Sequence, residues 1–153
     1  MLYTIQIDAA LAGIKAASRK DVFAALAERI SQDLGYSSQS LVETLMAKEE
    51  AFASGVGEGV AIPHMKSPLL QNRYVALATL AQPVDFGALD QKPADLICLL
   101  LSPEDHGGLH LRGLSRISRL LRNEELCQKL RDAQDEDTLK AHFTNPDGWL
   151  LAA

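Results

Sequence analysis

The segment at residues 55–66 reads GVGEGVAIPHMK and frames His64 more tightly than the other histidines of the sequence are framed. Pro63 has a fixed φ angle and favours an extended residue before it, so residues 59–63 are expected to form a short strand that brings His64 to the end of a sheet. A neutral imidazole near pH 7 is a good nucleophile and can take a phosphoryl group on a ring nitrogen. A histidine that merely ends a strand fits the same pattern, and on the residues alone both interpretations stay open.

Three glycines, Gly55, Gly57 and Gly59, alternate with other residues ahead of this histidine. Alternating glycines allow positive φ angles, and backbone N–H groups exposed in such a loop can bind an anion. The Lys-Ser pair after Met65 lacks the preceding glycine of a Walker A loop, and the glycine spacing does not give a dinucleotide fingerprint. The pattern indicates either a loop that donates hydrogen bonds to a phosphoryl group or a plain tight connection.

The other histidines suggest less chemistry. His106 and His110 are four residues apart, which is a metal-ligand spacing on a helix, but two glycines lie between them and we expect them not to share a helix. A metal site is therefore disfavoured. His110 begins a predicted helix, where it is either a surface residue or a second active-site group. His142 is expected to be a solvated or partly buried helix residue, and without a GxSxG elbow a serine hydrolase is unsupported.

The composition is that of one globular domain. The chain has 153 residues, of which 47% are hydrophobic and 23% charged, so it can bury a sizeable core without disulfides or metals. Its net charge is −5, and its basic residues are scattered, which argues against nucleic-acid binding but permits docking of a basic protein. Both cysteines, Cys98 and Cys127, are expected in the core of a protein from a reducing, cytoplasmic compartment. We expect no signal peptide and no membrane insertion, because no apolar run is long enough.

Local patterns predict interspersed strands and helices. Period-two alternation and short apolar runs predict strands at residues 2–7, 59–63, 74–80 and 95–101. Capping residues and helical periodicity predict helices from Ser18 through Leu34, from Ser40 through about Lys48, over residues 109–121, after Asn123 and after Asp135. The first helix has an apolar stripe at Val22, Leu26, Ile30 and Leu34, and Gly35 ends it. These elements predict an α/β fold in a single domain over residues 1–153, with residues 144–153 as an irregular tail.

Four stretches, taken together, resemble the type-2 enzyme IIA domains of the bacterial phosphotransferase system, the fructose, mannitol and nitrogen-regulatory group. They are SRKDVFAALAERI, GVGEGVAIPHMK, PVDFGALDQKPADLICLLLSPED and HLRGLSRISRLLRNEELCQKLRDAQDEDTLK. The likeness covers nearly the whole chain and is greatest to the stand-alone nitrogen-regulatory enzyme IIA. It implies a mixed central β-sheet with helices packed on both faces.

The resemblance also implies roles for particular residues. His64 would be the phosphoryl acceptor, through Nε2, and the donor would be a histidine-containing phosphocarrier protein. His110 matches the family's second active-site histidine, which stabilises the phosphorylated state. Lys48 stands where the family usually has arginine, and Ser54 keeps one hydroxyl of a common Ser-Thr pair. These two residues and the three glycines are expected to stabilise the phosphate, with no metal and no cofactor.

Three departures from the family pattern are expected to affect transfer. Lys48 keeps the positive charge but lacks the bidentate fork of arginine. Met65 replaces a glycine that usually follows the histidine, which could narrow access or alter the docking surface. Glu58 adds a negative charge to the glycine loop, and near a phosphoryl group it would oppose the build-up of charge.

The predicted function is that of a cytoplasmic phosphotransferase acting mainly as a phosphorylation-dependent regulator, of the nitrogen-regulatory type. The 153 residues include no B domain and no membrane domain, which favours regulation over transport. Its partners would be the phosphocarrier and regulatory target proteins. One alternative is a sugar-specific enzyme IIA that passes the phosphoryl group to a separate IIB protein. A second is a docking module without transfer, and a metal-binding protein is a third.

Overall fold

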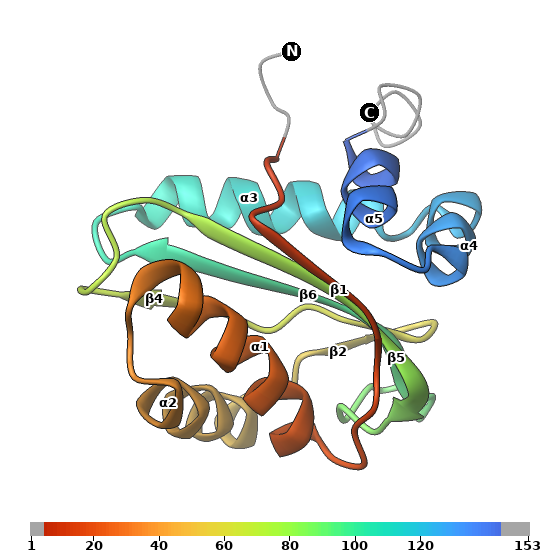
Figure 1. The fold of residues 1–153 in the computed structure, drawn as a ribbon, viewed down its shortest axis with the longest axis horizontal. Coiled ribbons are helices and arrows are strands. Elements are labelled where there is room, and N and C mark those ends of the chain that lie inside the picture. The colour runs from red at the N-terminus through yellow and green to blue at the C-terminus, as the bar shows by residue number, and fades with distance from the viewer. Residues whose placement is uncertain (1–4, 145–153) are drawn as a thin grey trace.

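A six-stranded sheet lies between two layers of helices in the part of the chain that the structure describes (Figure 1). The computed structural model describes residues 5–144, so residues 145–153 of the predicted tail lie outside it. The strands are β1 (Ala9–Ile14), β2 (Gly55–Gly57), β3 (Val60–Ala61), β4 (His64–Ser67), β5 (Tyr74–Val84) and β6 (Ala94–Pro103). The helices are α1 (Arg19–Leu34), α2 (Ser38–Ala51), α3 (Gly107–Leu120), α4 (Glu124–Asp132) and α5 (Glu136–Phe143). This arrangement confirms the predicted α/β class and the mixed sheet with helices on both faces.

The sheet has the order β1-β5-β6-β3-β2, and β4 also pairs with β6. The pairs β1–β5, β3–β6 and β4–β6 are parallel, whereas β5–β6 and β2–β3 are antiparallel. Strand β6 is therefore central, which explains why its sequence is a continuous apolar run: side chains on both of its faces are buried. Ile97, Leu99 and Leu101 face the cluster under α1 and α2, and Leu96, Cys98 and Leu100 face the cluster under α3, α4 and α5.

Strands β3 and β4 behave as one interrupted strand alongside β6. Val60 pairs with Leu96, and His64 pairs with Leu100, so the register is the same before and after the interruption. Pro63 lies in the gap, where it has no N–H to donate, but its carbonyl accepts from Leu100 N at 3.0 Å. The extended segment predicted to deliver His64 is thus present, and His64 is the first residue of β4.

Side-chain caps set the start of four of the five helices in the described residues, and three of these caps are at the predicted residue. Ser18 caps α1 by accepting from Asp21 N, Gly35 ends α1 with a φ of 78°, and Asn123 and Asp135 cap α4 and α5. The prediction for α2 was wrong, because Ser37 rather than Ser40 is the cap and the helix extends to Ala51. Ser40 instead supplies the N–H that donates to the Ser37 hydroxyl, at 3.2 Å.

Two further predictions need correction. The first strand runs over Ala9–Ile14 rather than residues 2–7, of which residues 2–4 lie outside the described range. Ile5 and Ile7 are buried, as their alternation predicted, but the parallel pairing with β5 begins only at Ala9. Leu34 is 37% exposed and does not complete the apolar stripe of α1, because it is the last residue of the helix.

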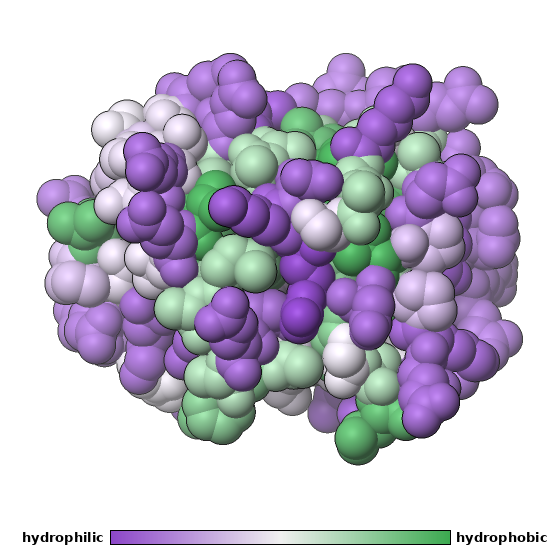
Figure 2. Space-filling model, turned by 90° about the horizontal axis from the view of Figure 1, so that it is seen from below, coloured by the Kyte–Doolittle hydropathy of each residue, from purple (hydrophilic) through white to green (hydrophobic). Residues whose placement is uncertain are grey.

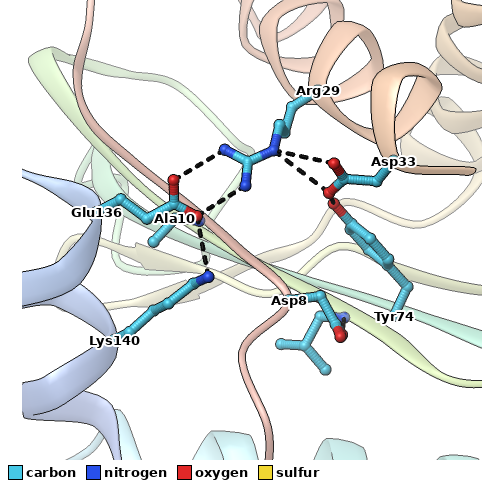
Figure 3. A network of polar contacts seen from close by, with 8 residues as sticks. Asp8, Ala10, Arg29, Asp33, Tyr74, Glu136 and Lys140 are labelled. Atoms are coloured by element: carbon cyan, nitrogen blue, oxygen red, sulfur yellow. Dashed lines mark hydrogen bonds and ion pairs between the residues drawn. The ribbon is translucent and has the colours of Figure 1, made fainter.

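A polar network ties the first helix to the last across strand β1 (Figure 3). Arg29 of α1 donates two hydrogen bonds to the carboxylate of Glu136 in α5, at 3.0 and 2.8 Å. The same carboxylate accepts from the backbone N–H of Ala10 in β1 and pairs with Lys140. The hydrogen bonds from Arg29 lower the pKa of Glu136 to about 2, so the carboxylate stays charged at neutral pH.

The face of the molecule formed by α1 and α2 carries a mixed surface. Figure 2 shows this side from below, with hydrophilic residues over most of it and hydrophobic residues in small separate patches. The helices within the described residues are all too short or too polar to span a bilayer.

Candidate functional site

The site centres on two histidines that lie 46 positions apart in the sequence. His64 Nδ1 and His110 Nε2 are 3.1 Å apart, which is hydrogen-bond distance. The first residue of β4 is His64, and His110 lies in the first turn of α3, which follows β6. Parallel pairing of β4 with β6 brings the beginning of β4 next to the end of β6, and therefore next to the start of α3.

His110 is held in turn by Ser102 near the end of β6. His110 Nδ1 lies 2.7 Å from Ser102 Oγ, and both residues are buried. The three side chains therefore form a hydrogen-bonded chain from the interior of the protein to His64. His64 itself is only partly buried, so it is the member of the chain that a partner can reach.

A cavity of about 260 Å³ opens beside His64, between α2 and the start of β4. Its lining includes Lys48 and Ser54, both of which were predicted to stabilise phosphate. The hydroxyl oxygen of Ser54 is buried, and none of the described residues hydrogen-bonds to it. A buried polar atom without a partner costs free energy unless a ligand satisfies it, so this hydroxyl is available to an oxygen-bearing group.

Glu49 fixes the loop that carries Ser54. Its side chain is almost fully buried, and its carboxylate accepts from the backbone N–H of Ser54 at 2.8 Å. Arg19 of α1 approaches the same carboxylate at 3.5 Å and partly balances its charge. The Ser54 carbonyl then accepts from Ile62 N at 2.9 Å, so one hydrogen-bonded path links α2 to the segment that leads into His64.

Gly55, Gly57 and Gly59 do not line the cavity that Lys48 and Ser54 line. Val60 pairs with Gly57, so Glu58 and Gly59 form the turn between β2 and β3, with φ angles of 56° and 81°. Positive φ at both central residues is the geometry of a tight hairpin turn. A Cβ on Gly59 would lie 2.7 Å from a guanidinium nitrogen of Arg131. Tight packing and turn geometry thus account for this glycine without a ligand.

Some backbone N–H groups of the segment that contains the glycines already donate hydrogen bonds within the protein. Gly55 N donates to the Phe86 carbonyl at 3.0 Å, and Glu58 N donates to the Asp90 carboxylate at 2.8 Å. The cavity beside His64 is not lined by Gly55, Gly57 or Gly59. The phosphate-binding role of these glycines stays a prediction, and the geometry favours the plain tight connection that the sequence left open.

The environment keeps both histidines neutral at pH 7. Burial lowers the pKa of His64, and the charge of Lys48 lowers it further. Burial also lowers the pKa of His110, and the charges of His64 in its protonated form, of Lys66 and of Lys48 lower it further. Since an unfolded histidine titrates near 6.5, the unfolded chain takes up these protons first as the pH falls, and folding is progressively disfavoured below that pH.

These causes predict separate responses to two lysine substitutions. Lys48→Gln is expected to raise the pKa of both His64 and His110, because it removes a positive charge that acts on both imidazoles. Lys66→Gln is the matched control: it is expected to raise the pKa of His110 while acting on His64 only weakly. Imidazole titrations followed by NMR would measure both values, and an unchanged His64 pKa in Lys48→Gln would contradict this account of the site.

Exposed apolar side chains surround the histidine pair. Phe52, at the end of α2, is 75% exposed, and Leu109 and Leu111 on either side of His110 are 53% and 66% exposed. The Lys48 ammonium lies 6.0 Å from the centre of the Phe52 ring, which places a cation against an aromatic face. Such a rim around a polar centre is typical of a surface that meets another protein.

Two of the departures from the family pattern, Glu58 and Met65, do not line the cavity beside His64. Glu58 is paired with Lys92 at 3.1 Å on the exposed hairpin turn, so its charge points to solvent. Met65 is 8% exposed and packs in the core cluster under α1 and α2, so it offers little surface to a partner. Only Lys48 among the three departures lines the cavity.

The remaining candidate residues do not form a site. His106 is the residue before α3, so it does not share that helix with His110, as predicted, but the helix begins at Gly107 rather than at Leu109. His142 is a partly buried residue of α5, as expected, and both cysteines are buried. Among the described residues, no three histidine, cysteine or carboxylate side chains are grouped so that they could hold a metal ion.

Sequence reasoning missed three residues of the site. Ser102 lies in β6, just beyond the predicted strand over residues 95–101, and a serine at the end of a buried apolar strand is a signal for a polar group held beneath a site. Glu49 is a charged residue on the buried side of α2, and its burial depends on Arg19 and on the Ser54 backbone. Phe52 is the C-cap residue of α2, and its side chain is both exposed and part of the cavity lining.

Comparison with known proteins gives a consistent result. A family model described as the phosphoenolpyruvate-dependent sugar phosphotransferase system, EIIA 2, matches residues 5–145. The chain is 38% identical over 139 residues to the nitrogen regulatory protein of Bradyrhizobium diazoefficiens, with 91% of each chain covered. It is 37% identical over 99 residues to the fructose-specific EIIA component of Haloferax volcanii, with 65% of this chain and 64% of that protein covered.

The fold is also found among solved structures. The crystal structure of the nitrogen regulatory protein IIA-Ntr from Neisseria meningitidis superposes with a TM-score of 0.82 at 28% sequence identity. The superposition covers 88% of this chain and 92% of the other. The likeness therefore extends over the sheet and both helical layers.

Proposed function

The chain belongs to the EIIA 2 family of the phosphoenolpyruvate-dependent sugar phosphotransferase system, and from this premise we propose that His64 accepts a phosphoryl group from a histidine-containing phosphocarrier protein. Members of this family carry out phosphoryl transfer through a histidine. In the proposed step, His64 Nε2 attacks the phosphorus of the donor's phosphohistidine in line. The new Nε2–P bond forms as the donor's N–P bond breaks, and that electron pair returns to the donor imidazole.

The observation that carries this proposal is the hydrogen-bonded chain from Ser102 through His110 to His64. A nucleophilic Nε2 needs a free lone pair, so the proton of neutral His64 must be on Nδ1, where it is donated to His110 Nε2. His110 must then carry its own proton on Nδ1 and donate it to Ser102 Oγ. One proton arrangement therefore satisfies all three groups and leaves His64 Nε2 free to react.

Lys48 and Ser54 are the residues that we propose to hold the transferred group. The ammonium of Lys48 would offset the added negative charge, and the buried hydroxyl of Ser54 would donate to a phosphoryl oxygen. Lysine acts here as a point charge and lacks the two parallel N–H donors of arginine, so it would hold the phosphoryl group less firmly than an arginine. Gly55, Gly57 and Gly59 would act by shaping the hairpin that leads into His64.

The output that we propose is regulatory and cytoplasmic, of the nitrogen-regulatory type. A phosphoryl group adds a charge of about −1.5 to −2 at neutral pH. On His64 this charge would lie among the exposed side chains of Phe52, Leu109 and Leu111, so a target protein that contacts this surface would bind the phosphorylated and free forms differently. The match to a nitrogen regulatory protein covers more of the chain than the match to the fructose-specific component, which favours this reading. A sugar-specific role, with transfer to a separate IIB protein, is the alternative that the second match supports.

Intact-mass spectrometry after incubation with a phosphorylated carrier protein tests the proposal directly. The nitrogen-branch and sugar-branch carriers are tried separately, and fragment spectra locate the added group. A gain of one phosphoryl group on His64 is the expected result. If neither carrier produces a gain, the chain is a docking module without transfer, and if the group is found on another residue, the proposed acceptor is wrong.

Ser102→Ala is expected to slow phosphoryl acceptance about tenfold, the rate equivalent of one lost hydrogen bond of about 1–1.5 kcal/mol. His110 would lose the acceptor that fixes its proton on Nδ1. His110 Nε2 would then no longer be held as an acceptor, and the proton of His64 would no longer be fixed on Nδ1. Single-turnover transfer from the phosphorylated carrier measures the rate, and imidazole ¹⁵N shifts report the tautomers. Ser102→Thr keeps the hydroxyl and should restore both readouts, so a slow threonine variant with normal tautomers would point to packing instead.

A further inference from the structure

Although most basic residues of the chain are scattered, helix α3 and the residues just after it carry several arginines that the proposed transfer does not use. Residues 107–123 contain four arginines and no aspartate or glutamate, within a chain whose net charge is −5. The buried residues of α3 are His110, Gly113, Ile117 and Leu120. At 3.6 residues per turn, Arg112 and Arg119 lie on the side of the helix opposite these residues. Both are exposed, as is Arg122 just after the helix. Together these three residues form what we call the arginine patch.

The arginine patch has no ionic partner in the part of the chain that is described. Arg19, Arg29 and Arg131 all form ion pairs within the protein. No described residue pairs with the three patch arginines. The nearest acidic residues in sequence are Glu104 and Asp105 before α3, and Glu124 and Glu125 after it, so acidic residues lie next to the patch along the chain at both ends. Guanidinium groups that lack an acidic partner within the protein, as the three of the arginine patch do, favour association with a negatively charged partner.

The surroundings of the patch fit a protein better than a nucleic acid or a membrane. Exposed Leu109 and Leu111 lie at the beginning of the same helix, and arginine with apolar side chains is a composition typical of protein interfaces. A nucleic-acid-binding domain is usually basic as a whole, whereas this chain is acidic. A helix that lies on a membrane needs a broad apolar face turned outward, but the apolar face of α3 is buried in the core.

We propose that the arginine patch is a docking surface for an acidic helix of a partner protein. Arg112 and Arg119 are two helical turns apart, about 10.5 Å along the axis. Carboxylates seven residues apart on a facing helix have the same spacing, so both pairs can form together. This proposal goes beyond phosphoryl transfer at His64 and does not depend on it.

Binding of a labelled helical peptide tests the proposal. The peptide carries glutamates at positions i and i+7 with leucines beside them, and a second peptide has glutamine at the same positions. Fluorescence polarisation at low salt is expected to show binding of the glutamate peptide only, weakening as salt is added. Arg112→Gln combined with Arg119→Gln is expected to weaken binding by at least about fivefold, since two ion pairs are lost. Lys15→Gln combined with Lys20→Gln removes two exposed charges elsewhere and should leave the affinity unchanged.

Three results would overturn the proposal. They are no binding of the glutamate peptide, equal weakening by both variant pairs, and a short DNA duplex or phosphatidylserine vesicles binding more tightly than the peptide through the same two arginines. Phosphoryl acceptance is measured in parallel on the same arginine variant and is expected to be that of the wild type. A failed docking test with normal acceptance would then count against this proposal alone.

Discussion

A His64→Ala chain is expected to gain no phosphoryl group under conditions in which the wild-type chain gains one. The substitution removes the nucleophile itself, and loss of a nucleophile costs on the order of 10⁶-fold in rate in a well-studied hydrolase. His110 is buried, its Nε2 faces His64, and its Nδ1 faces Ser102, so it is not placed to replace the missing acceptor. Intact-mass spectra collected over a time course with the phosphorylated carrier would measure the loss.

The matched control for this experiment is His142→Ala. His142 is a histidine of α5 that is also partly buried, and it lies outside the site, so its replacement should leave acceptance unchanged. Thermal unfolding of both variants separates loss of the acceptor from loss of the fold. Phosphorylation of a folded His64→Ala chain at the wild-type rate would show that the acceptor is elsewhere.

Phe23→Ala is expected to lower the free energy of unfolding by about 3–5 kcal/mol, enough to threaten the fold of a domain of this size. Phe23 is fully buried in the cluster between α1 and the sheet. Its ring meets Phe86 edge to face, with 6.0 Å between the ring centres, so the truncation removes an aromatic contact and leaves a cavity. Denaturation by urea, followed by circular dichroism, gives the free energy.

Phe52→Ala makes the same chemical change on the surface. Phe52 is 75% exposed, so its truncation should alter the free energy of unfolding by no more than about 0.5–1 kcal/mol. Transfer from the carrier, however, is expected to slow in this variant, because Phe52 lines the cavity beside His64. Similar losses of stability in the two variants would mean that the core under α1 has been wrongly assigned.

The elements that could be predicted from sequence are those with local signals. Ser18, Asn123 and Asp135 each accept a hydrogen bond from a residue three positions on, so their caps can be recognised in a few residues. Strand β6 is equally clear, because an apolar run between two prolines is long enough for a buried strand and too short for a helix.

The elements that escaped prediction depend on distant partners. Strand β1 reads AALAGI, which is poor in β-branched and aromatic residues, and it is a strand because β5 pairs with it. The cap of α2 could not be assigned because Ser37, Ser38 and Ser40 all offer hydroxyls, and only the entry angle of the chain selects among them. In both cases tertiary pairing rather than local preference decides the outcome.

The site divides in the same way. His64 and His110 could be singled out because residue type and family likeness point to them, and the structure brings them within 3.1 Å. Ser102 and Glu49 act through contacts with backbone and side-chain groups elsewhere in the chain, and the neighbouring sequence does not show which groups these are. The role of the glycines stays a prediction, since a hairpin turn and an anion-binding loop call for the same residue type.

The contact between Glu136 and the backbone of Ala10 has a consequence for association between chains. Strand β1 is an edge strand, and an edge strand with free amides is a template for pairing with another molecule. The Glu136 carboxylate occupies the Ala10 N–H at 3.3 Å, and α5 is held across this edge by Arg29. Because the pKa of Glu136 is about 2, this protection is complete at neutral pH and is lost as the pH falls from about 4.5 toward 2. Acid is therefore expected to weaken this contact and to leave the edge of β1 more open to pairing with another molecule.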